Sequence, residues 1–498
     1  MDSVQYILSP REAFVAEQQW RVVKRSVDAR QRELRVHLTI LTDDQGKPIA
    51  KDAPIPLYEP PVFQDAHHAT RSAIIIGAGP AGLFAALTLL EHGIKPIIYE
   101  RGKEVSERKK DIALLNRNEG LNPESNYCFG EGGAGTFSDG KLFSRSKKRG
   151  NMQRVMELFH YFGAPDTVLY EAHAHIGSDK LPGIIKRMRE TILEKGGEIH
   201  FETKVESLST FNFQLSPLIL AIGHSAHDTY RMLAAEGVTL ETKGFAMGVR
   251  AEHPQSLINK LMYHIVESQK SKVESVIDYV GNASYSLVTQ VDGRGVYSFC
   301  MCPGGHIVPA GSEAGSCVVN GMSASHRNSP YANSGMVVQI NPEDIPGDDP
   351  LRGLAFQEDL ERLAFEHGGP QAQAPAQRLK DFVEGKASKD LPACSYLPGI
   401  IPSRLDQWLP THIGKRLQQG FRDFNKKYPG FLTNDAVIVG VESRSSSAVR
   451  IPRDPETLQS VSTPNLYPCG EGAGYAGGIT SSALDGINAA LKIAELAR

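Results

Sequence analysis

The sequence predicts an α/β protein with a parallel sheet, a second domain built on an antiparallel sheet, and a small α+β domain at the N-terminus. Three observations predict this fold class. Unbroken apolar runs such as 73–76 and 217–221 are typical of parallel strands buried on both faces. Short segments at 285–291 and 295–302 alternate in polarity, as antiparallel strands do. Residues 1–42 follow a strand, helix, strand pattern.

These patterns divide the chain into segments. A proline-rich stretch with little periodicity separates the N-terminal domain from the rest and is expected to be a linker. Apolar runs at 435–441 and 465–470 are assigned to the parallel sheet, so that its domain is interrupted by the antiparallel one. The predicted segments are 1–50 (small α+β domain), 51–71 (linker), 72–245 (first part of the parallel-sheet domain), 246–430 (inserted substrate domain) and 431–498 (C-terminal part of the parallel-sheet domain).

A glycine-rich turn follows the first apolar strand and opens an apolar helix. Its glycines, Gly77, Gly79 and Gly82, have the spacing GxGxxG, and Glu100 ends the next strand. In a Rossmann-like dinucleotide site the first glycine allows a tight turn, the second admits a pyrophosphate and the third lets helix and strand pack closely. The helix N-terminus attracts the phosphates, and the acidic residue binds ribose hydroxyls. The sequence therefore predicts a Rossmann-like FAD/NAD(P)-binding fold.

A second loop rich in glycine, serine and threonine occupies 126–142. Such a loop suits close approach of the backbone to a phosphate or a sugar chain. We expect Gly133, Thr136, Ser138 and Lys141 to contact the cofactor.

Bulk composition excludes several classes of protein. The formal net charge is −3, and the basic runs at 108–110 and 145–149 are interpreted as solvated surfaces, so no nucleic-acid partner is expected. The six cysteines form no disulfide-like framework, which predicts a reduced, cytoplasmic protein. Three glycines and a proline interrupt the uncharged run at 73–90, so no membrane partner is expected. The oligomeric state is not indicated.

Eight segments together resemble a largely uncharacterised, mainly bacterial family of FAD-dependent dehydrogenases, within the single-Rossmann branch of the glutathione-reductase-like flavoproteins. The segments are KRSVDAR (24–30), GAGPAGLFAALTL (77–89), FGEGGAGTFSDGKL (129–142), HIGSDKL (175–181), GFAMGVRAEHPQ (244–255), YSFCMCPGG (297–305), VESRSSS (441–447) and CGEGAGYAGGITSSALDG (469–486).

The resemblance implies FAD as the cofactor and assigns roles to further residues. Arg101 closes the ribose site, the Val205 backbone contacts adenine, and Glu471 approaches the pyrophosphate and ribityl chain. The last helix begins near Gly478 and Ile479 and points at the flavin, where its N-terminus would stabilise a reduced, anionic ring. The full set predicted to bind FAD is Gly77, Ala78, Gly79, Pro80, Ala81, Gly82, Glu100, Arg101, Gly133, Thr136, Ser138, Lys141, Val205, Gly223, Glu471, Gly478 and Ile479.

The predicted function is that of an FAD-dependent oxidoreductase, a dehydrogenase acting on a small organic substrate with an unidentified electron donor or acceptor. A flavin monooxygenase using NAD(P)H and oxygen is the enzymatic alternative. A flavoprotein with structural or sensory FAD, acting as a docking module, is the alternative of another class. No second strand, GxGxxG and helix unit follows residue 100, so no dedicated nicotinamide domain is expected.

Candidates for catalysis are Lys141, His175 and Arg444, which lie in the segments that carry the resemblance. A cation beside the flavin could bind an anionic substrate, and a histidine could transfer a proton. No metal site is predicted. Cys300 and Cys302 invite a redox role, but a disulfide across one residue is strained and buried cysteines are usually inert, so the sequence favours a structural role.

Overall fold

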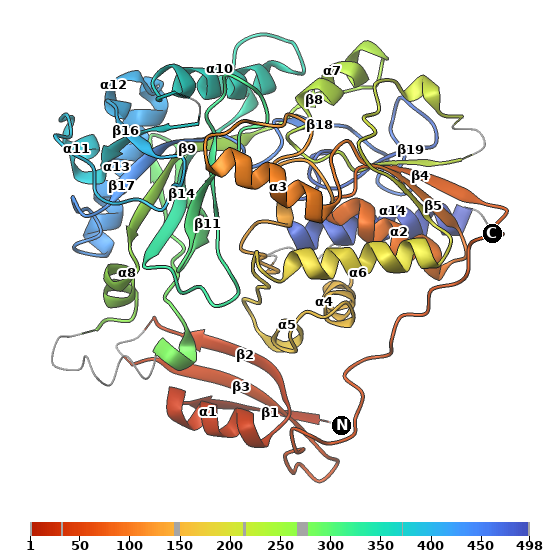
Figure 1. Cartoon of the computed structure of the whole chain (residues 1–498). Helices are drawn as coiled ribbons and strands as arrows, with labels where there is room; N and C mark the ends of the chain where they lie inside the picture. The colour runs from red at the N-terminus through yellow and green to blue at the C-terminus, as the bar shows by residue number, and fades with distance from the viewer. Residues whose placement is uncertain are drawn as a thin grey trace.

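The structure is a computed structural model and describes residues 2–30, 33–143, 150–212, 216–265, 277–370 and 372–496. The basic run at 145–149 lies outside the described residues. Two sheets organise the chain, and the small N-terminal domain lies below them in Figure 1.

The first sheet has five parallel strands, in the order β19 (Leu466–Pro468), β7 (Leu218–Leu220), β4 (Ser72–Ile76), β5 (Lys95–Tyr99) and β6 (Glu198–His200). β4, β5, β7 and β19 lie where the apolar runs predict strands. β6 ends at His200, and the next strand in the described chain is β7.

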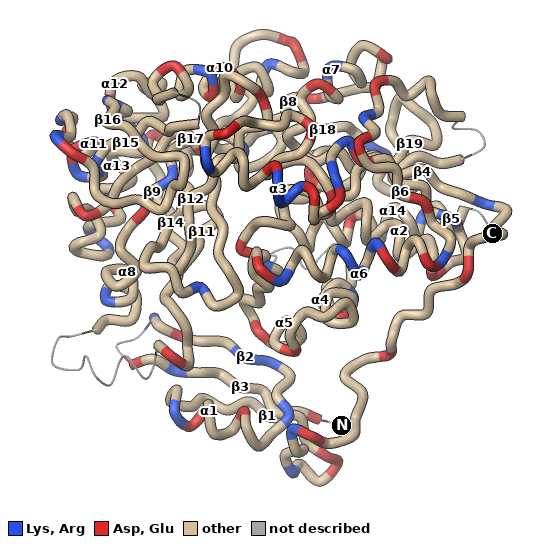
Figure 2. The backbone as a smooth tube through the Cα atoms, in the orientation of Figure 1, with Lys and Arg blue, Asp and Glu red and all other residues tan. Residues whose placement is uncertain are grey.

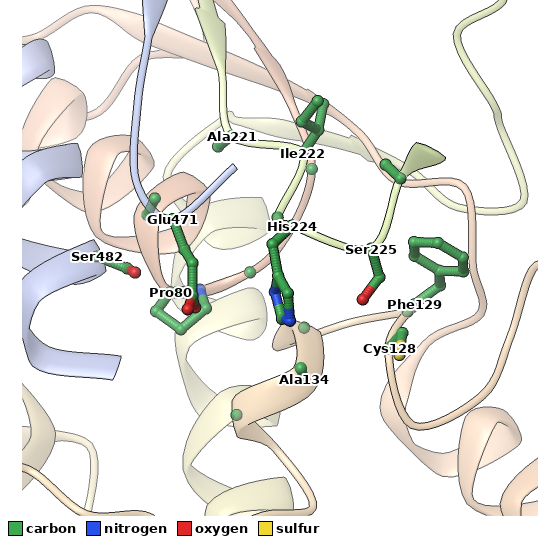
Figure 3. Close-up of a pocket in the computed structure, with 18 of the residues that line it drawn as sticks. Pro80, Cys128, Phe129, Ala134, Ala221, Ile222, His224, Ser225, Glu471 and Ser482 are labelled. Atoms are coloured by element: carbon green, nitrogen blue, oxygen red, sulfur yellow. The ribbon is translucent and has the colours of Figure 1, made fainter. Parts of the chain in front are cut away.

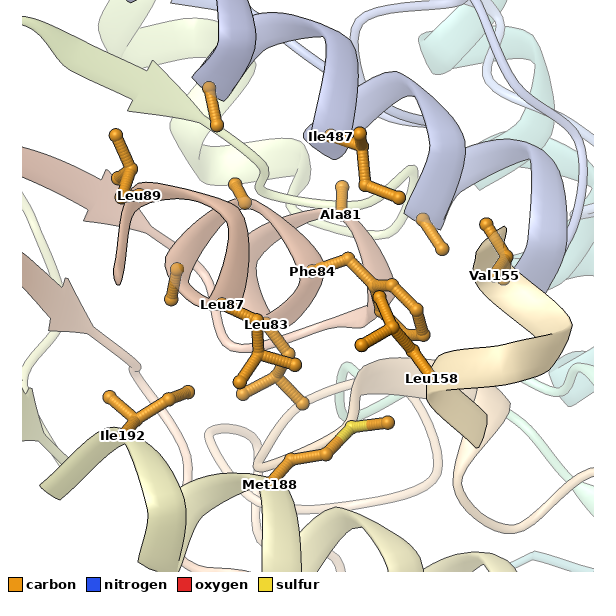
Figure 4. Close-up of a cluster of buried hydrophobic side chains, with 14 of the residues drawn as sticks. Ala81, Leu83, Phe84, Leu87, Leu89, Val155, Leu158, Met188, Ile192 and Ile487 are labelled. Atoms are coloured by element: carbon orange, nitrogen blue, oxygen red, sulfur yellow. The ribbon is translucent and has the colours of Figure 1, made fainter. Parts of the chain in front are cut away.

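Helices cover this sheet and bury an apolar core against it. α2 (Pro80–Glu91) is buried along almost its whole length, and α4 (Met152–Tyr161), α6 (Leu181–Glu194) and α14 (Ile479–Leu496) surround it. Figure 4 shows Phe84 of α2 between side chains from α4 and α14. The C-terminal helix therefore completes the same domain that the first glycine turn begins.

The second sheet has seven strands and is antiparallel except for one parallel pair at its edge, between β15 and β16. The two segments predicted to alternate form β10 and β11, which pair antiparallel, as expected. Its strand order is β10 (Val288–Val291), β11 (Arg294–Cys302), β14 (Tyr331–Ile340), β9 (Phe245–Pro254), β17 (Val437–Glu442), β15 (Ala374–Arg378) and β16 (Ile400–Pro402).

The assignment of the run at 435–441 to the parallel sheet is wrong. β17 (Val437–Glu442) pairs antiparallel with β9 and β15 and is buried on both faces in the second sheet. A central strand covered on both faces is uniformly apolar whatever the direction of its neighbours, so the run alone does not distinguish the sheets.

Residues 2–42 form a three-stranded antiparallel sheet with one helix. The order is β1 (Asp2–Leu8), β3 (Arg35–Thr42), β2 (Val22–Asp28), with α1 (Pro10–Gln19) packed on it. The predicted strand, helix, strand order is correct, but β2 is an additional strand. Ser9 and Glu12 form a capping box that fixes the start of α1.

The remaining regular elements complete the two large domains. The parallel-sheet side holds α3 (Val105–Asn116), α5 (Thr167–Tyr170), α7 (His227–Ala235) and the β8 (Glu241–Thr242) and β18 (Val449–Arg450) pair. The other side holds α8 (Gln255–Met262), β12 (His306–Pro309), β13 (Val319–Met322), α10 (Arg352–Glu366), α11 (Leu379–Glu384), α12 (Leu405–Trp408) and α13 (Thr411–Lys427).

Acidic and basic residues are interspersed along the chain in Figure 2, as the small net charge predicts. Within the described part of the chain, no helix combines the length and the apolar character needed to cross a membrane.

Candidate functional site

A large cavity opens at the carboxyl ends of three adjacent parallel strands. Ile76 ends β4, Ala221 follows β7 and Cys469 follows β19, and all three line the cavity. Ligands of open parallel sheets bind at such strand ends. Figure 3 shows Glu471 and His224 directed into this space, with Cys128 and Phe129 on another wall.

The glycines of the GxGxxG turn separate into two kinds. A Cβ on Gly77 would lie 2.4 Å from the Ala221 oxygen, and a Cβ on Gly82 would lie 1.9 Å from the Gly77 oxygen. A Cβ on Gly79 would meet no protein atom closer than 3.8 Å, and Gly79 lines the cavity. Gly77 and Gly82 thus serve packing, whereas the space beside Gly79 is left for a ligand.

The start of α2 has the geometry of an anion-binding site. Gly79 is the N-cap, Pro80 is the first helical residue, and no described side chain caps the helix. The first-turn N–H groups and the positive end of the helix dipole therefore face the cavity. This cradle fits the pyrophosphate of a dinucleotide.

Glu100 anchors the strand end next to this helix. Its Oε2 accepts a hydrogen bond from Ala78 N at 2.8 Å, and its Oε1 accepts from Gly102 N at 2.9 Å and Gly130 N at 3.0 Å. A carboxylate has about four lone-pair sites, so ribose hydroxyls can still donate to it. Glu100 thus ties together the segments that form this end of the cavity.

Removing the Glu100 carboxylate is expected to weaken FAD. Glu100→Ala should weaken the binding free energy of FAD by about 1–3 kcal/mol, because charged hydrogen bonds are lost and the three amides are left unpaired. Equilibrium titration of the FAD-free protein measures it. Exposed Glu119→Ala is the control, and an equal dissociation constant in both variants would mean that the ribose is held elsewhere.

Arg108 holds the second glycine loop, and its assignment to a solvated basic run is wrong. The side chain is fully buried and donates to the carbonyl oxygens of Asn126, Tyr127, Gly130, Glu131 and Gly133. Burial lowers the pKa of the guanidinium to about 10, so it remains charged at neutral pH. A basic run in a helix does not reveal which of its members faces inward.

Glu471 and the start of α14 form the third side of the cavity. Glu471, Gly478 and Ile479 all line it, as predicted from the resemblance to flavoproteins. Burial raises the pKa of Glu471 to about 7, with the Lys243 charge opposing the shift and negative charge on the Cys300 sulfur adding to it.

The raised pKa of Glu471 predicts a pH dependence of stability. Between the usual pKa of 4.5 and about 7, the folded protein holds a proton that the unfolded chain releases. Stability conferred by this group is therefore complete below pH 4.5 and is lost as the pH rises towards 7. Denaturant unfolding of FAD-free protein should show a smaller loss over this interval in Glu471→Gln than in the wild type; parallel curves would contradict the assignment.

The structure brings most of the predicted FAD-binding residues together. Those that line the cavity are Gly77, Gly79, Pro80, Ala81, Glu100, Arg101, Gly133, Ser138, Val205, Gly223, Glu471, Gly478 and Ile479. Four others are not among the described lining residues. Ala78 and Gly82 act in the turn itself, Thr136 donates to the Glu131 oxygen, and Lys141 contacts Cys300 and Cys302.

Of the three catalytic candidates, only Arg444 lines the cavity. Glu361 holds its guanidinium at 2.9 and 2.8 Å, and Ser312 accepts from it at 2.7 Å. His175 contacts the Ser325 oxygen at 3.1 Å and lies outside the lining that the structure describes.

A smaller chamber adjoins the large cavity and is lined in part by β12 and β13. The two share Cys128, Ser138, His224, Asn320 and Arg444 among their lining residues. The chamber also has apolar walls, from Phe137, Val308 and Val319.

His224 is a site residue that the sequence analysis missed. Its Nε2 lies 3.0 Å from the Arg444 oxygen and donates to it, so Nδ1 keeps its lone pair. Burial and the Arg444 charge lower the pKa of His224 to about 4, so the ring is neutral at pH 7. Its place directly after the β7 turn, at a strand's carboxyl end, is the signal that identifies it.

One cluster in the described residues has the composition of a metal site. Ligand atoms of His227, Glu313 and Glu358 lie within 4.8 Å of one another. His227 Nδ1 pairs with Glu358 at 3.0 Å, and Arg231 also pairs with Glu358. An ion-pair network accounts for this grouping.

Comparison with known proteins identifies the family. Residues 70–211 match the family model described as an FAD binding domain, and 244–445 match the one described as FAD-dependent protein, C-terminal domain-like. An uncharacterised protein of Clostridium beijerinckii is 43% identical over 438 residues, which cover 85% of this chain and 80% of that protein. The chain belongs to this family of FAD-dependent proteins. FAD is its cofactor, and the Gly79 cradle and the α2 N-terminus fit that group.

Solved structures give more distant likenesses. CtdE in complex with FAD matches with a TM-score of 0.30 and 10% identity, covering 85% of this chain and 84% of that one. CmlS, a flavin-dependent halogenase, matches with a TM-score of 0.35 and 14% identity, covering 86% of this chain and 59% of that one. Likenesses this weak say nothing about the reaction of this protein.

Proposed function

We propose that this protein is an FAD-dependent oxidoreductase whose substrate binds in the smaller chamber that adjoins the FAD cavity. The observation that carries the proposal is the continuity of that chamber with the FAD cavity through His224, Asn320 and Arg444. A purely structural or sensory FAD has no need of a chamber that opens onto its own cavity.

The chamber favours a small organic substrate with an apolar body and a polar or anionic group. Phe137, Val308 and Val319 offer apolar contacts, and Arg444 offers a cation whose fork is fixed by Glu361. His224 is neutral at pH 7, and its Nδ1 lone pair is suited to accept a hydrogen bond from the substrate. When bound, FAD supplies two-electron redox chemistry, and these residues bind and orient the substrate next to it.

Two reactions are compatible with this arrangement. The match to an FAD binding domain supports a monooxygenase at least as well as a dehydrogenase. The described chain has one parallel sheet, and the other large sheet is mostly antiparallel. We therefore propose neither a dehydrogenase nor a monooxygenase with a dedicated nicotinamide-binding domain.

Reduction by nicotinamide tests this proposal. Anaerobic mixing of oxidised holoprotein with NADH or NADPH should bleach the flavin slowly, at a rate that rises linearly with nicotinamide concentration. Fast reduction that saturates would establish the monooxygenase reading and contradict the dehydrogenase reading. Flavin that dithionite reduces but that neither oxygen nor a quinone reoxidises would contradict the oxidoreductase proposal itself.

A further inference from the structure

Cys300 and Cys302 lie where β11 bulges at the edge of the FAD cavity. Phe299 pairs with Gly335 and Cys302 with Asn333, so β11 carries one residue more than β14 over this interval. Cys300 is left-handed, with φ 46°, a conformation that is uncommon for any residue except glycine. Its side chain lines the cavity, and Cys302 is fully buried behind it.

Two cations face these thiols. Lys141 Nζ lies 3.8 Å from Cys300 Sγ and 3.6 Å from Cys302 Sγ. Arg250 Nη2 lies 3.5 Å from Cys302 Sγ and donates to the Cys300 oxygen at 2.7 Å. The two cations come from the second glycine loop and from β9, so both domains contribute to the environment of the cysteines.

This environment shifts the pKa values of the two cysteines in opposite directions. A hydrogen bond from Cys302, together with the Lys141 and Arg250 charges, holds the pKa of Cys300 well below its usual range. The same hydrogen bond and burial hold the pKa of Cys302 well above its usual range. The environment therefore favours the thiolate at Cys300 and the thiol at Cys302.

Carboxylates behind the cations fix their positions. Asp139 lies 3.5 Å from Lys141 Nζ and also pairs with Arg327, and Glu442 lies 2.8 Å from Arg250 Nη1. Burial raises the pKa of Glu442 to about 7. These ion pairs thus hold the two cations in place beside the sulfur atoms.

We propose that Cys300 and Cys302 form a redox-active dithiol that exchanges two electrons with FAD. An S–S bond forms between the Cys300 thiolate and the Cys302 sulfur, and the Cys302 S–H bond breaks. The two electrons and that one proton go to oxidised FAD, which is reduced, so charge and atoms balance. The reverse step restores the dithiol when the flavin is reduced by another donor.

A disulfide across one residue is strained, and this strain favours a disulfide that is readily reduced again. Strained disulfides are the readily reduced ones, and low-pKa cysteines next to cations are the reactive ones. Two cysteines with a purely structural role would need neither a cation beside their sulfur atoms nor a position in the wall of the cofactor cavity.

Differential alkylation of wild-type holoprotein tests the proposal without a variant. Air-oxidised protein and anaerobically dithionite-reduced protein are each alkylated, digested and read by mass spectrometry. Cys300 and Cys302 should be joined in the first sample and alkylated in the second, whereas Cys394 should be alkylated to the same extent in both. Equal alkylation of Cys300 and Cys302 in the two samples would overturn the proposal.

Electron counting supplies an independent readout. Anaerobic dithionite titration should deliver four electrons to the wild type and to Cys394→Ser, but two to Cys302→Ser. In FAD-free protein, Lys141→Met should slow alkylation of Cys300 about tenfold, because the thiolate loses a cation. Uptake of only two electrons by the wild type would overturn the proposed redox-active dithiol. The inference rests on FAD in the cavity, but its failure would leave the proposed function standing, since the flavin still takes up its own pair.

Discussion

Gly79→Val is expected to abolish FAD binding while leaving the fold intact. Gly79 has φ −77° and ψ −173°, a region that valine also adopts, and a Cβ there meets no protein atom closer than 3.8 Å. The added methyl groups would enter the cavity at the N-terminus of α2, where the pyrophosphate is held. Affinity for FAD should fall at least about 100-fold, or about 2.8 kcal/mol.

The neighbouring glycine provides a matched comparison. A Cβ on Gly82 would lie 1.9 Å from the Gly77 oxygen, so Gly82→Ala should lower the melting temperature of the FAD-free protein. Calorimetry and FAD titration of both variants separate the two roles: Gly79→Val loses affinity with unchanged stability, and Gly82→Ala loses both. Wild-type affinity in Gly79→Val would disprove the placement of the pyrophosphate.

Loss of Arg108 should produce the largest effect on stability. Five carbonyl oxygens between Asn126 and Gly133 accept hydrogen bonds from its guanidinium, and the side chain is fully buried. Arg108→Leu leaves these buried acceptors unpaired and should cost about 3–5 kcal/mol of unfolding free energy. FAD affinity should fall as well, because the loop that Arg108 holds lines the cavity.

Lys110 is the matched control, since it belongs to the same basic run but is exposed. Lys110→Ala should change the unfolding free energy by no more than about 0.5 kcal/mol. Should Arg108→Leu fail to fold, Arg108→Lys keeps the charge but offers three donors from one point, and it should still be clearly destabilised. Equal denaturation midpoints for the Arg108 and Lys110 variants would contradict the role of Arg108.

The sequence by itself predicted the parallel sheet, the glycine turn and most of the cavity wall. The GxGxxG turn, the apolar strand before it and the acidic residue at the end of the next strand are local signals, because all three lie within one β-α-β unit. The far-end loop at 469–486 was also placed correctly, because its resemblance to flavoproteins links it to the first turn, and Glu471 and Gly478 line the same cavity. The relation to the glutathione-reductase-like flavoproteins stays a prediction.

Only the tertiary structure decided which residues meet across the chain. Apolar β17 pairs with β9 and β15 in the second sheet, and because these partners lie far from it in sequence, its own residues did not reveal them. Arg108 turned inward because the carbonyls it serves belong to a loop that folds over α3, and Lys141 reached Cys300 and Cys302 across two domains. Periodicity and motifs report what surrounds a residue along the chain, whereas buried charge and thiol reactivity depend on what surrounds it in space.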